Sequence, residues 1–125
     1  MGVIAVQVNR AGPNTHAARA VFAHDPVATE EAMAATASAA RPRWAKLSPN
    51  VTDITPIAGA VLEAGANAVT LINTEMGLAI DPTTGKARLG NGGGGVSGAA
   101  IHPVAVRAVY DIRAAFPGAA TVGVG

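Results

Sequence analysis

The sequence predicts an α/β fold in which parallel strands alternate with helices. Apolar segments rich in β-branched residues recur along the chain, and helix-forming segments that begin beside a proline lie between them. The predicted strands are residues 3–8, 43–47, 67–72 and 121–124. Half of the residues are hydrophobic and only 14% are charged, so a packed core is expected rather than disorder. Strands separated by helices imply a parallel sheet with right-handed crossovers.

Three helices are predicted from local start and stop signals. Asp25 is suited to cap a helix that begins with a proline, and this helix extends to about residue 40. Thr55 and Pro56 are predicted to cap a second helix, with Gly65 just past its end. This second helix has apolar residues at the i, i+3, i+4, i+7 spacing of one face: Ile54, Ile57, Ala58, Val61 and Leu62.

A third helix is predicted from Pro103 through Phe116, with Arg107 and Asp111 spaced to form an i, i+4 ion pair. Four other charged residues are interpreted as parts of solvated faces: Glu30, Glu31, Arg41 and Arg43.

An insertion at residues 76–100 interrupts the alternation of strands and helices. Residues 81–85 carry a turn signal between two short extended arms, which predicts a small hairpin. Four parallel strands with helices suited to one side are about half of a TIM (β/α)₈ barrel, which takes about 250 residues. Because the chain also begins and ends directly at predicted strands, residues 1–125 are expected to form a single, partial barrel domain.

Composition excludes several classes of function. A net charge of +1 provides no basic stripe for nucleic acid, and the absence of cysteine excludes disulfides and cysteine-ligated metals within the chain. No segment approaches the roughly 20 apolar residues of a membrane span, and no secretory signal is visible. The three histidines, His16, His24 and His102, show no metal-ligand spacing. A cytoplasmic protein without a metal site is therefore expected.

Polar residues follow the predicted strands at their carboxyl ends, where α/β proteins bind ligands. These residues are Asn9, Lys46, Asn73 with Thr74, and Gly125. Amide and ammonium donors that meet at one rim suit a ligand rich in oxygen acceptors, such as a planar imide, a carboxylate or a phosphate. Lys46 is also suited to place positive charge beside an electron-accepting heterocycle.

Each of these features has a simpler interpretation. A single asparagine at a strand end is often a turn former, and a single lysine there is often solvated. Backbone NH groups around Gly94, Gly95 and Gly98 are suited to cradle a phosphate, but the glycine run is equally consistent with a flexible loop. The functional interpretation depends on several donors falling at strand ends together.

Three segments carry a more specific signal: Lys46-Leu47-Ser48-Pro49-Asn50-Val51-Thr52-Asp53-Ile54, then Leu71-Ile72-Asn73-Thr74 followed by Met76-Gly77, then Gly94-Gly95-Val96-Ser97-Gly98. In combination they resemble the soluble class 1 dihydroorotate dehydrogenases, and most of all the NAD-linked subclass. The resemblance runs along almost the whole chain. It implies a TIM barrel, of which this chain is a fragment supplying the fourth to seventh strands. It also implies bound FMN and the oxidation of (S)-dihydroorotate to orotate in pyrimidine biosynthesis.

The resemblance also implies roles for individual residues. It matches Lys46 to a flavin-contacting lysine and Asn9 to an asparagine shared by flavin and substrate. The remaining matches are substrate contacts at Asn14, Asn73 and Thr74, backbone flavin contacts at Ile72 and Gly98, and a flavin-phosphate contact at Gly125. A separate iron–sulfur flavoprotein subunit is the implied electron-transfer partner.

One position departs from the family pattern. The family carries Asn-x-Ser-Cys-Pro-Asn, in which the cysteine removes the substrate C5 proton, whereas Gly12 stands at that position here. Loss of a general base typically costs about 10²–10⁴-fold in rate, so this chain alone is expected to be inactive. His16 lies nearby, but its spacing does not match the lost base.

Two alternatives to this enzyme remain. One is a non-catalytic truncated remnant that self-associates through open sheet edges as a homo-oligomer. The other is a fragment of a flavin domain like that of dihydropyrimidine dehydrogenase, which shares some of the motifs.

Overall fold

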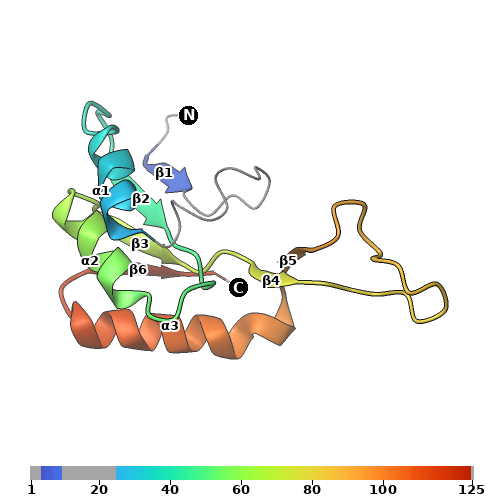
Figure 1. The fold of residues 1–125 in the computed structure, drawn as a ribbon. Coiled ribbons are helices and arrows are strands. Elements are labelled where there is room, and N and C mark those ends of the chain that lie inside the picture. Colours follow the sequence, from blue (N-terminus) through green and yellow to red (C-terminus); the bar gives the residue numbers. More distant parts are fainter. Residues whose placement is uncertain (1–3, 10–24, 125) are drawn as a thin grey trace.

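A computed structural model describes residues 4–9 and 25–124 of the chain (Figure 1). In this part, four parallel strands form one sheet in the order β1-β2-β3-β6. Their bounds are Val6–Asn9 for β1, Arg43–Lys46 for β2, Ala68–Leu71 for β3 and Ala120–Gly123 for β6. All four predicted strands and their parallel arrangement are confirmed.

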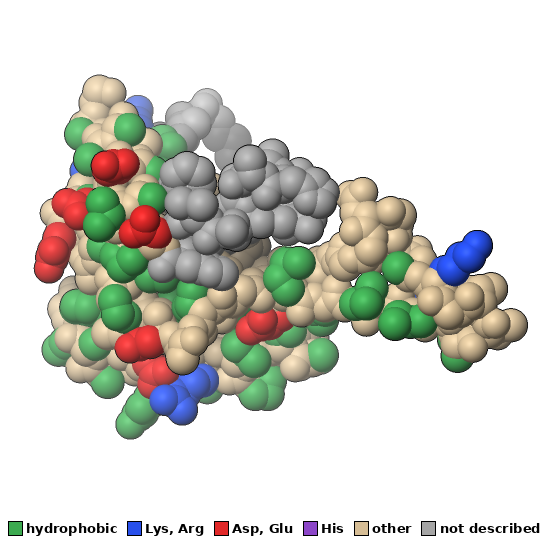
Figure 2. Space-filling model, in the orientation of Figure 1, with side chains coloured by type: hydrophobic (Ala, Val, Ile, Leu, Met, Phe, Trp, Pro, Cys, Tyr) green, Lys and Arg blue, Asp and Glu red, His purple; other side chains and the backbone are tan. Residues whose placement is uncertain are grey.

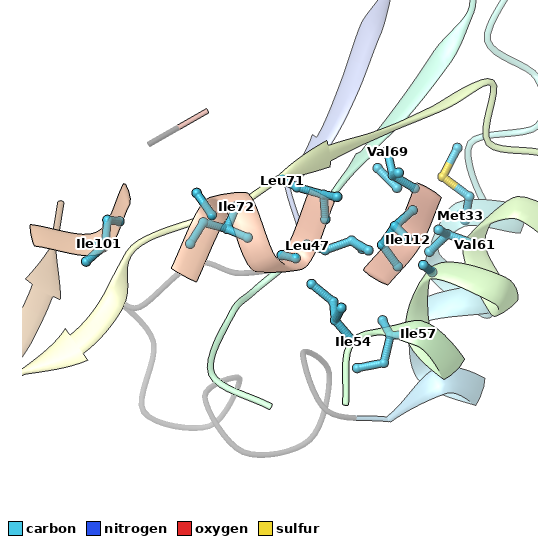
Figure 3. Close-up of a cluster of buried hydrophobic side chains, with 14 residues drawn as sticks. Met33, Leu47, Ile54, Ile57, Val61, Val69, Leu71, Ile72, Ile101 and Ile112 are labelled. Carbon is cyan, nitrogen blue, oxygen red and sulfur yellow. The ribbon is translucent and has the colours of Figure 1, made fainter. Parts of the chain in front are cut away.

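The described helices cover one face of this sheet (Figure 1). They are α1 at Pro26–Ala34, α2 at Thr55–Glu63 and α3 at His102–Ala115, and a short 3₁₀ helix, η1 at Ala99–Ile101, directly precedes α3. Figure 3 shows the core between the two layers, where Met33, Val61 and Ile112 from the three helices meet Val69 and Leu71 of β3. Parallel strands with helices on one face are the arrangement that the alternating sequence pattern predicts.

The opposite face of the sheet is more polar. Ala45 belongs to the helix-covered core, and side chains alternate along a strand, so its neighbour Lys46 lies on the opposite face. In the sheet register, Lys46 pairs with Asn9 on β1 and with Thr70 on β3. Thr70 is 2% exposed, and its hydroxyl donates a 2.9 Å hydrogen bond to Gln7 Oε1. The face opposite the helices therefore carries polar side chains near the strand carboxyl ends, and these side chains do not belong to the hydrophobic core.

Helix α1 starts as predicted but ends early. Asp25 accepts a 2.9 Å hydrogen bond from the Val27 N–H, which confirms it as the N-cap. The helix ends at Ala34, so the prediction that it extends to about residue 40 is wrong. The Met33 carbonyl is taken by the Thr36 hydroxyl at 2.7 Å and by Arg43 Nη1 at 2.9 Å. These bonds compete with continuation of the helical ladder.

Arg43 is not the solvated residue that the sequence suggested, whereas Glu30, Glu31 and Arg41 are exposed as expected. Besides its bond to α1, the Arg43 guanidinium donates to the Gly65 carbonyl at 2.9 Å. Gly65 has φ +88°, and the N–H of the next residue bonds back to the Val61 carbonyl at 2.9 Å. This is a Schellman end for α2, as Gly65 predicts. Arg43 therefore holds the ends of two helices together.

The starts and surface pairs of α2 and α3 differ only slightly from expectation. Thr55 does not cap α2 with its side chain; Asp53 Oδ1 accepts from the Thr55 N–H at 2.8 Å instead. The predicted pair on α3 is confirmed, with Arg107 Nε 2.7 Å from Asp111 Oδ2. The hydrogen bond to Asp111 raises the pKa of Arg107 above its ordinary value.

The predicted hairpin is confirmed as an arm that extends away from the sheet (Figure 1). Strands β4 at Glu75–Gly77 and β5 at Gly94–Val96 pair antiparallel at its base. Hydrophobic side chains lie along the arm, with Lys and Arg near its far end (Figure 2). Exposed hydrophobic residues of the arm are Met76, Leu78, Ile80, Leu89 and Val96.

No helix in residues 4–9 and 25–124 is both long and apolar enough to cross a membrane.

Candidate ligand site at the strand carboxyl ends

The carboxyl ends of β1, β2 and β3 bring polar side chains from distant parts of the sequence to one rim. Asn73 Nδ2 lies 3.5 Å from Asn9 Oδ1, although 64 residues separate them. Asn9 also pairs with Lys46 in the sheet register. The Asn73 N–H donates to the Leu47 carbonyl at 2.9 Å, which fixes the loop after β3 against the end of β2. Lys46, Asn9 and Asn73 are therefore neighbours where the three strands end.

Lys46 is half-buried on the face of the sheet that the helices leave open. In the part of the chain that the structure describes, the one ion pair is Arg107–Asp111, so no described carboxylate neutralises Lys46. A lysine of this kind carries its charge on a flexible stem whose three donors can turn toward an anionic or carbonyl-rich ligand.

The loop after β3 presents Thr74 in a fixed orientation. The Thr74 N–H donates to Asn73 Oδ1 at 3.0 Å, and its carbonyl accepts from Asn50 Nδ2 at 2.9 Å. Gly95 of β5 packs against the Thr74 side chain so closely that a Cβ there would overlap the hydroxyl. Gly95 therefore has a packing role in a strand rather than a place in a flexible loop.

The two backbone positions matched to flavin contacts differ in what they offer. Ile72 is buried and its N–H donates to the Val124 carbonyl at 3.0 Å, so only its carbonyl remains for a ligand. Gly98 has φ +86°, and apart from its chain neighbours no atom of the described residues lies within 4 Å of where a Cβ would be. Open space and a left-handed backbone beside the start of α3 allow a ligand to approach the main chain closely.

Sequence reasoning missed Asn50 as an individual residue of the site. Its side chain bonds to Ser48 in its own loop and to the Thr74 carbonyl in the loop after β3. In the sequence, the turn residues Ser48-Pro49-Asn50 indicate only that the Asn50 side chain can form hydrogen bonds within its own turn. Its partners 24 and 26 residues away are not visible in the sequence.

Three positions matched to the family lie outside the described residues: Gly12, Asn14 and Gly125. His16, which does not match the lost base in spacing, lies outside them as well. Within the described residues, no group of three or more His, Cys, Asp or Glu side chains is arranged to hold a metal ion.

A parallel sheet with helices on one face and ligand-type groups at its carboxyl ends is the arrangement found in part of a TIM barrel. The fold of DHODH from Eimeria tenella, solved in complex with ferulenol, matches with a TM-score of 0.71 at 19% identity. The match covers 97% of this chain and 39% of that one.

The sequence identifies the family. The family model for dihydroorotate dehydrogenase matches residues 2–125, and the chain belongs to this family of oxidoreductases. The catalytic subunit of dihydroorotate dehydrogenase B (NAD(+)) from Solidesulfovibrio magneticus is 45% identical over 99% of this chain and 41% of its own length. Dihydroorotate dehydrogenase A (fumarate) from Lacticaseibacillus paracasei is 46% identical over 88% of this chain and 38% of its own length. The chain thus spans about two fifths of these relatives, and the predicted family is confirmed.

Proposed function

We propose that this chain carries part of the FMN and pyrimidine site of an enzyme that oxidises (S)-dihydroorotate to orotate. The observation that carries the proposal is the meeting of Asn9, Lys46 and Asn73 at one rim of the sheet, in a chain of this family. Residues 1–125 are taken as one partial barrel domain. The resemblance further supports a cytoplasmic protein with an iron–sulfur flavoprotein partner, as the subunit naming of the NAD(+)-linked relative suggests for that protein.

The chemistry of the donor set fits FMN. The flavin ring has an imide edge with carbonyl acceptors, which suits an ammonium group and amides that both donate and accept. Lys46 would hold this edge, and Asn9 would contact flavin and substrate together. Open space at Gly98 leaves room for close approach of the ring system to the backbone. When bound, FMN supplies the hydride acceptor of the reaction.

Asn73 and Thr74 would bind the pyrimidine. Asn73 offers an amide and Thr74 a hydroxyl, and both belong to a loop that hydrogen bonds fix to the end of β2. Groups held in this way keep the substrate ring in one orientation beside the flavin edge. Asn14 and Gly125 would add a substrate contact and a phosphate contact, as the resemblance implies.

Proton removal is the step that this chain lacks. Gly12 stands where the family has its basic cysteine, and glycine has no side chain to accept a proton. We therefore propose that the chain alone binds its ligands but turns over slowly or not at all.

Substitution of Lys46 tests the flavin part of the proposal. Lys46→Ala is expected to weaken FMN binding by about 10- to 100-fold, because a hydrogen bond from a charged donor is worth about 1.5–3 kcal/mol. Quenching of flavin fluorescence during titration of the 125-residue chain measures the dissociation constant. Lys86→Ala is the matched control, since Lys86 is an exposed lysine of the arm. Equal affinities in the two variants would contradict the role of Lys46.

Self-association is a second candidate property, and the open sheet edges favour it. In the described residues, β1 pairs only with β2 and β6 only with β3, so each outer strand has an unpaired edge. Ile4, Val6 and Val124 add exposed apolar side chains at these edges. Unpaired edges of this kind promote pairing with another chain. Light scattering after size exclusion is expected to show dimers or larger species, and a monomer at all concentrations would contradict this.

A further inference from the structure

We infer that Asn50 is a positioning residue, which locks the peptide of Thr74 so that the Thr74 hydroxyl faces the proposed pyrimidine. The inference rests on the proposed function for the identity of the ligand, and on hydrogen bonds of the described residues for the geometry. Asn50 Nδ2 donates to Ser48 Oγ at 3.0 Å and to the Thr74 carbonyl at 2.9 Å. Its Oδ1 accepts from the Met76 N–H at 2.7 Å.

These contacts use the amide of Asn50 almost completely. A side-chain amide has two N–H donors, and both are engaged within the chain. Asn50 therefore has no donor left for a ligand. Its role is to hold other groups in place.

Asn50 fixes one side of the Thr74 peptide, and Asn73 fixes the other. The Thr74 carbonyl is bound by Asn50 and its N–H by Asn73 Oδ1 at 3.0 Å. With both backbone groups bound, the hydroxyl is the polar group of Thr74 that remains for a ligand, and Gly95 closes the space beside it. A change in the orientation of the Thr74 peptide group would therefore displace this hydroxyl.

Ser48 holds the Asn50 side chain in place through hydrogen bonds. Ser48 is 8% exposed, and its Oγ accepts from both the backbone N–H of Asn50 at 3.2 Å and the side-chain Nδ2. Ser48 also lies two residues after Lys46, so Asn50 joins the loop that carries the proposed flavin contact to the loop that carries the pyrimidine contacts. The two ligand sites are thereby held in a fixed relation.

Asn50→Asp tests the inference with little change of shape. The aspartate keeps an acceptor for the Met76 N–H but replaces the amide nitrogen and its two donors by one carboxylate oxygen, which repels the Thr74 carbonyl. Calorimetric titration of the FMN-saturated chain with orotate is expected to show at least about tenfold weaker binding in this variant, a change of about 1.4 kcal/mol. FMN affinity is expected to change less than twofold, because Lys46 is untouched.

Asn67→Ala is the matched structural control. Asn67 Oδ1 accepts from the Arg43 N–H at 2.8 Å at the opposite end of the sheet, so its loss lowers stability away from the rim. The melting temperature should fall with Asn67→Ala while orotate affinity stays unchanged. Ser48→Ala, which loosens Asn50 without touching Thr74, should weaken orotate binding by an intermediate amount.

Hydrogen exchange of the Met76 amide measures the hydrogen bonding of Asn50 without any ligand. The Met76 N–H should exchange faster in Asn50→Ala, which removes its acceptor, and remain protected in Asn50→Asp. If Asn50→Asp binds orotate as well as the wild-type chain, or if Asn67→Ala weakens orotate equally, the positioning role is wrong. If the wild-type chain binds FMN but no orotate, the proposed pyrimidine site fails, and the role of Asn50 fails with it.

Discussion

Gly12→Cys is expected to accelerate flavin reduction by dihydroorotate about 10²–10⁴-fold, the usual contribution of a positioned general base. The cysteine would accept the C5 proton as the hydride leaves the substrate for FMN. Anaerobic mixing of the FMN-loaded chain with dihydroorotate, followed at the visible flavin absorbance, measures the single-turnover rate. Gly90→Cys is the control, because it adds a thiol on the arm where a Cβ meets no neighbour. Equal rates in the two variants would contradict the assignment of position 12.

The same experiment separates the two enzyme classes that share these motifs. Dihydrouracil lacks the carboxylate of dihydroorotate, so an enzyme of the dihydropyrimidine dehydrogenase type would accept it in preference. The Gly12→Cys chain is expected to react with dihydroorotate and not with dihydrouracil. Reduction by dihydrouracil alone would overturn the proposed substrate.

Leu71→Ala is expected to cause a large loss of stability, about 2–5 kcal/mol, because it opens a cavity in a packed core. Leu71 is fully buried at 0% exposure, on an inner strand of the sheet and against the helix layer (Figure 3). Equilibrium urea unfolding measures the loss as a lower midpoint. Leu89→Ala removes the same atoms from a side chain that is 52% exposed on the arm, and it should change stability by less than about 0.5 kcal/mol. Similar unfolding midpoints for the two variants would contradict the packing of Leu71 in the hydrophobic core.

Features that depend on neighbouring residues could be predicted from the sequence. Asp25 and Gly65 mark helix ends through contacts a few residues away, and both act as their types predict. The hairpin around Asp81 follows from turn chemistry in the same way, with the Gly85 N–H bonded to the Asp81 carbonyl at 2.8 Å. The alternation of strands and helices then places Lys46 and Asn73 at one rim, because parallel strands end on the same side.

Features that depend on distant contacts could not be predicted. Helix α1 stops at Ala34 partly because Arg43 binds the Met33 carbonyl, and nothing in an alanine-rich segment signals that competition. The sequence indicates a solvated charge at Arg43, because the Gly65 carbonyl that its guanidinium binds is 22 residues away. Asn50 is similar, since its partners at Thr74 and Met76 belong to a loop and an arm that follow the next strand.

The glycine run shows how one sequence feature can have two structural reasons. Gly94 and Gly95 pair with β4, and Gly95 leaves room for the Thr74 side chain. Gly98 instead has a left-handed backbone with open space around it. Composition alone does not separate these roles, because the packing of Gly95 against Thr74 depends on the pairing of β5 with β4 at the base of the arm.

We propose that the carboxyl ends of the parallel strands form the flavin-binding rim. Titration of the ¹⁵N-labelled chain with FMN, followed by backbone amide chemical shifts, tests it most directly. Saturable shifts are expected at the strand ends, at Asn9, Lys46, Asn73 and Gly98, with the amide of Asn67 at the opposite end of the sheet unchanged. Shifts confined to the helix layer or the arm, or no saturable shifts at all, would show that this rim does not bind the flavin.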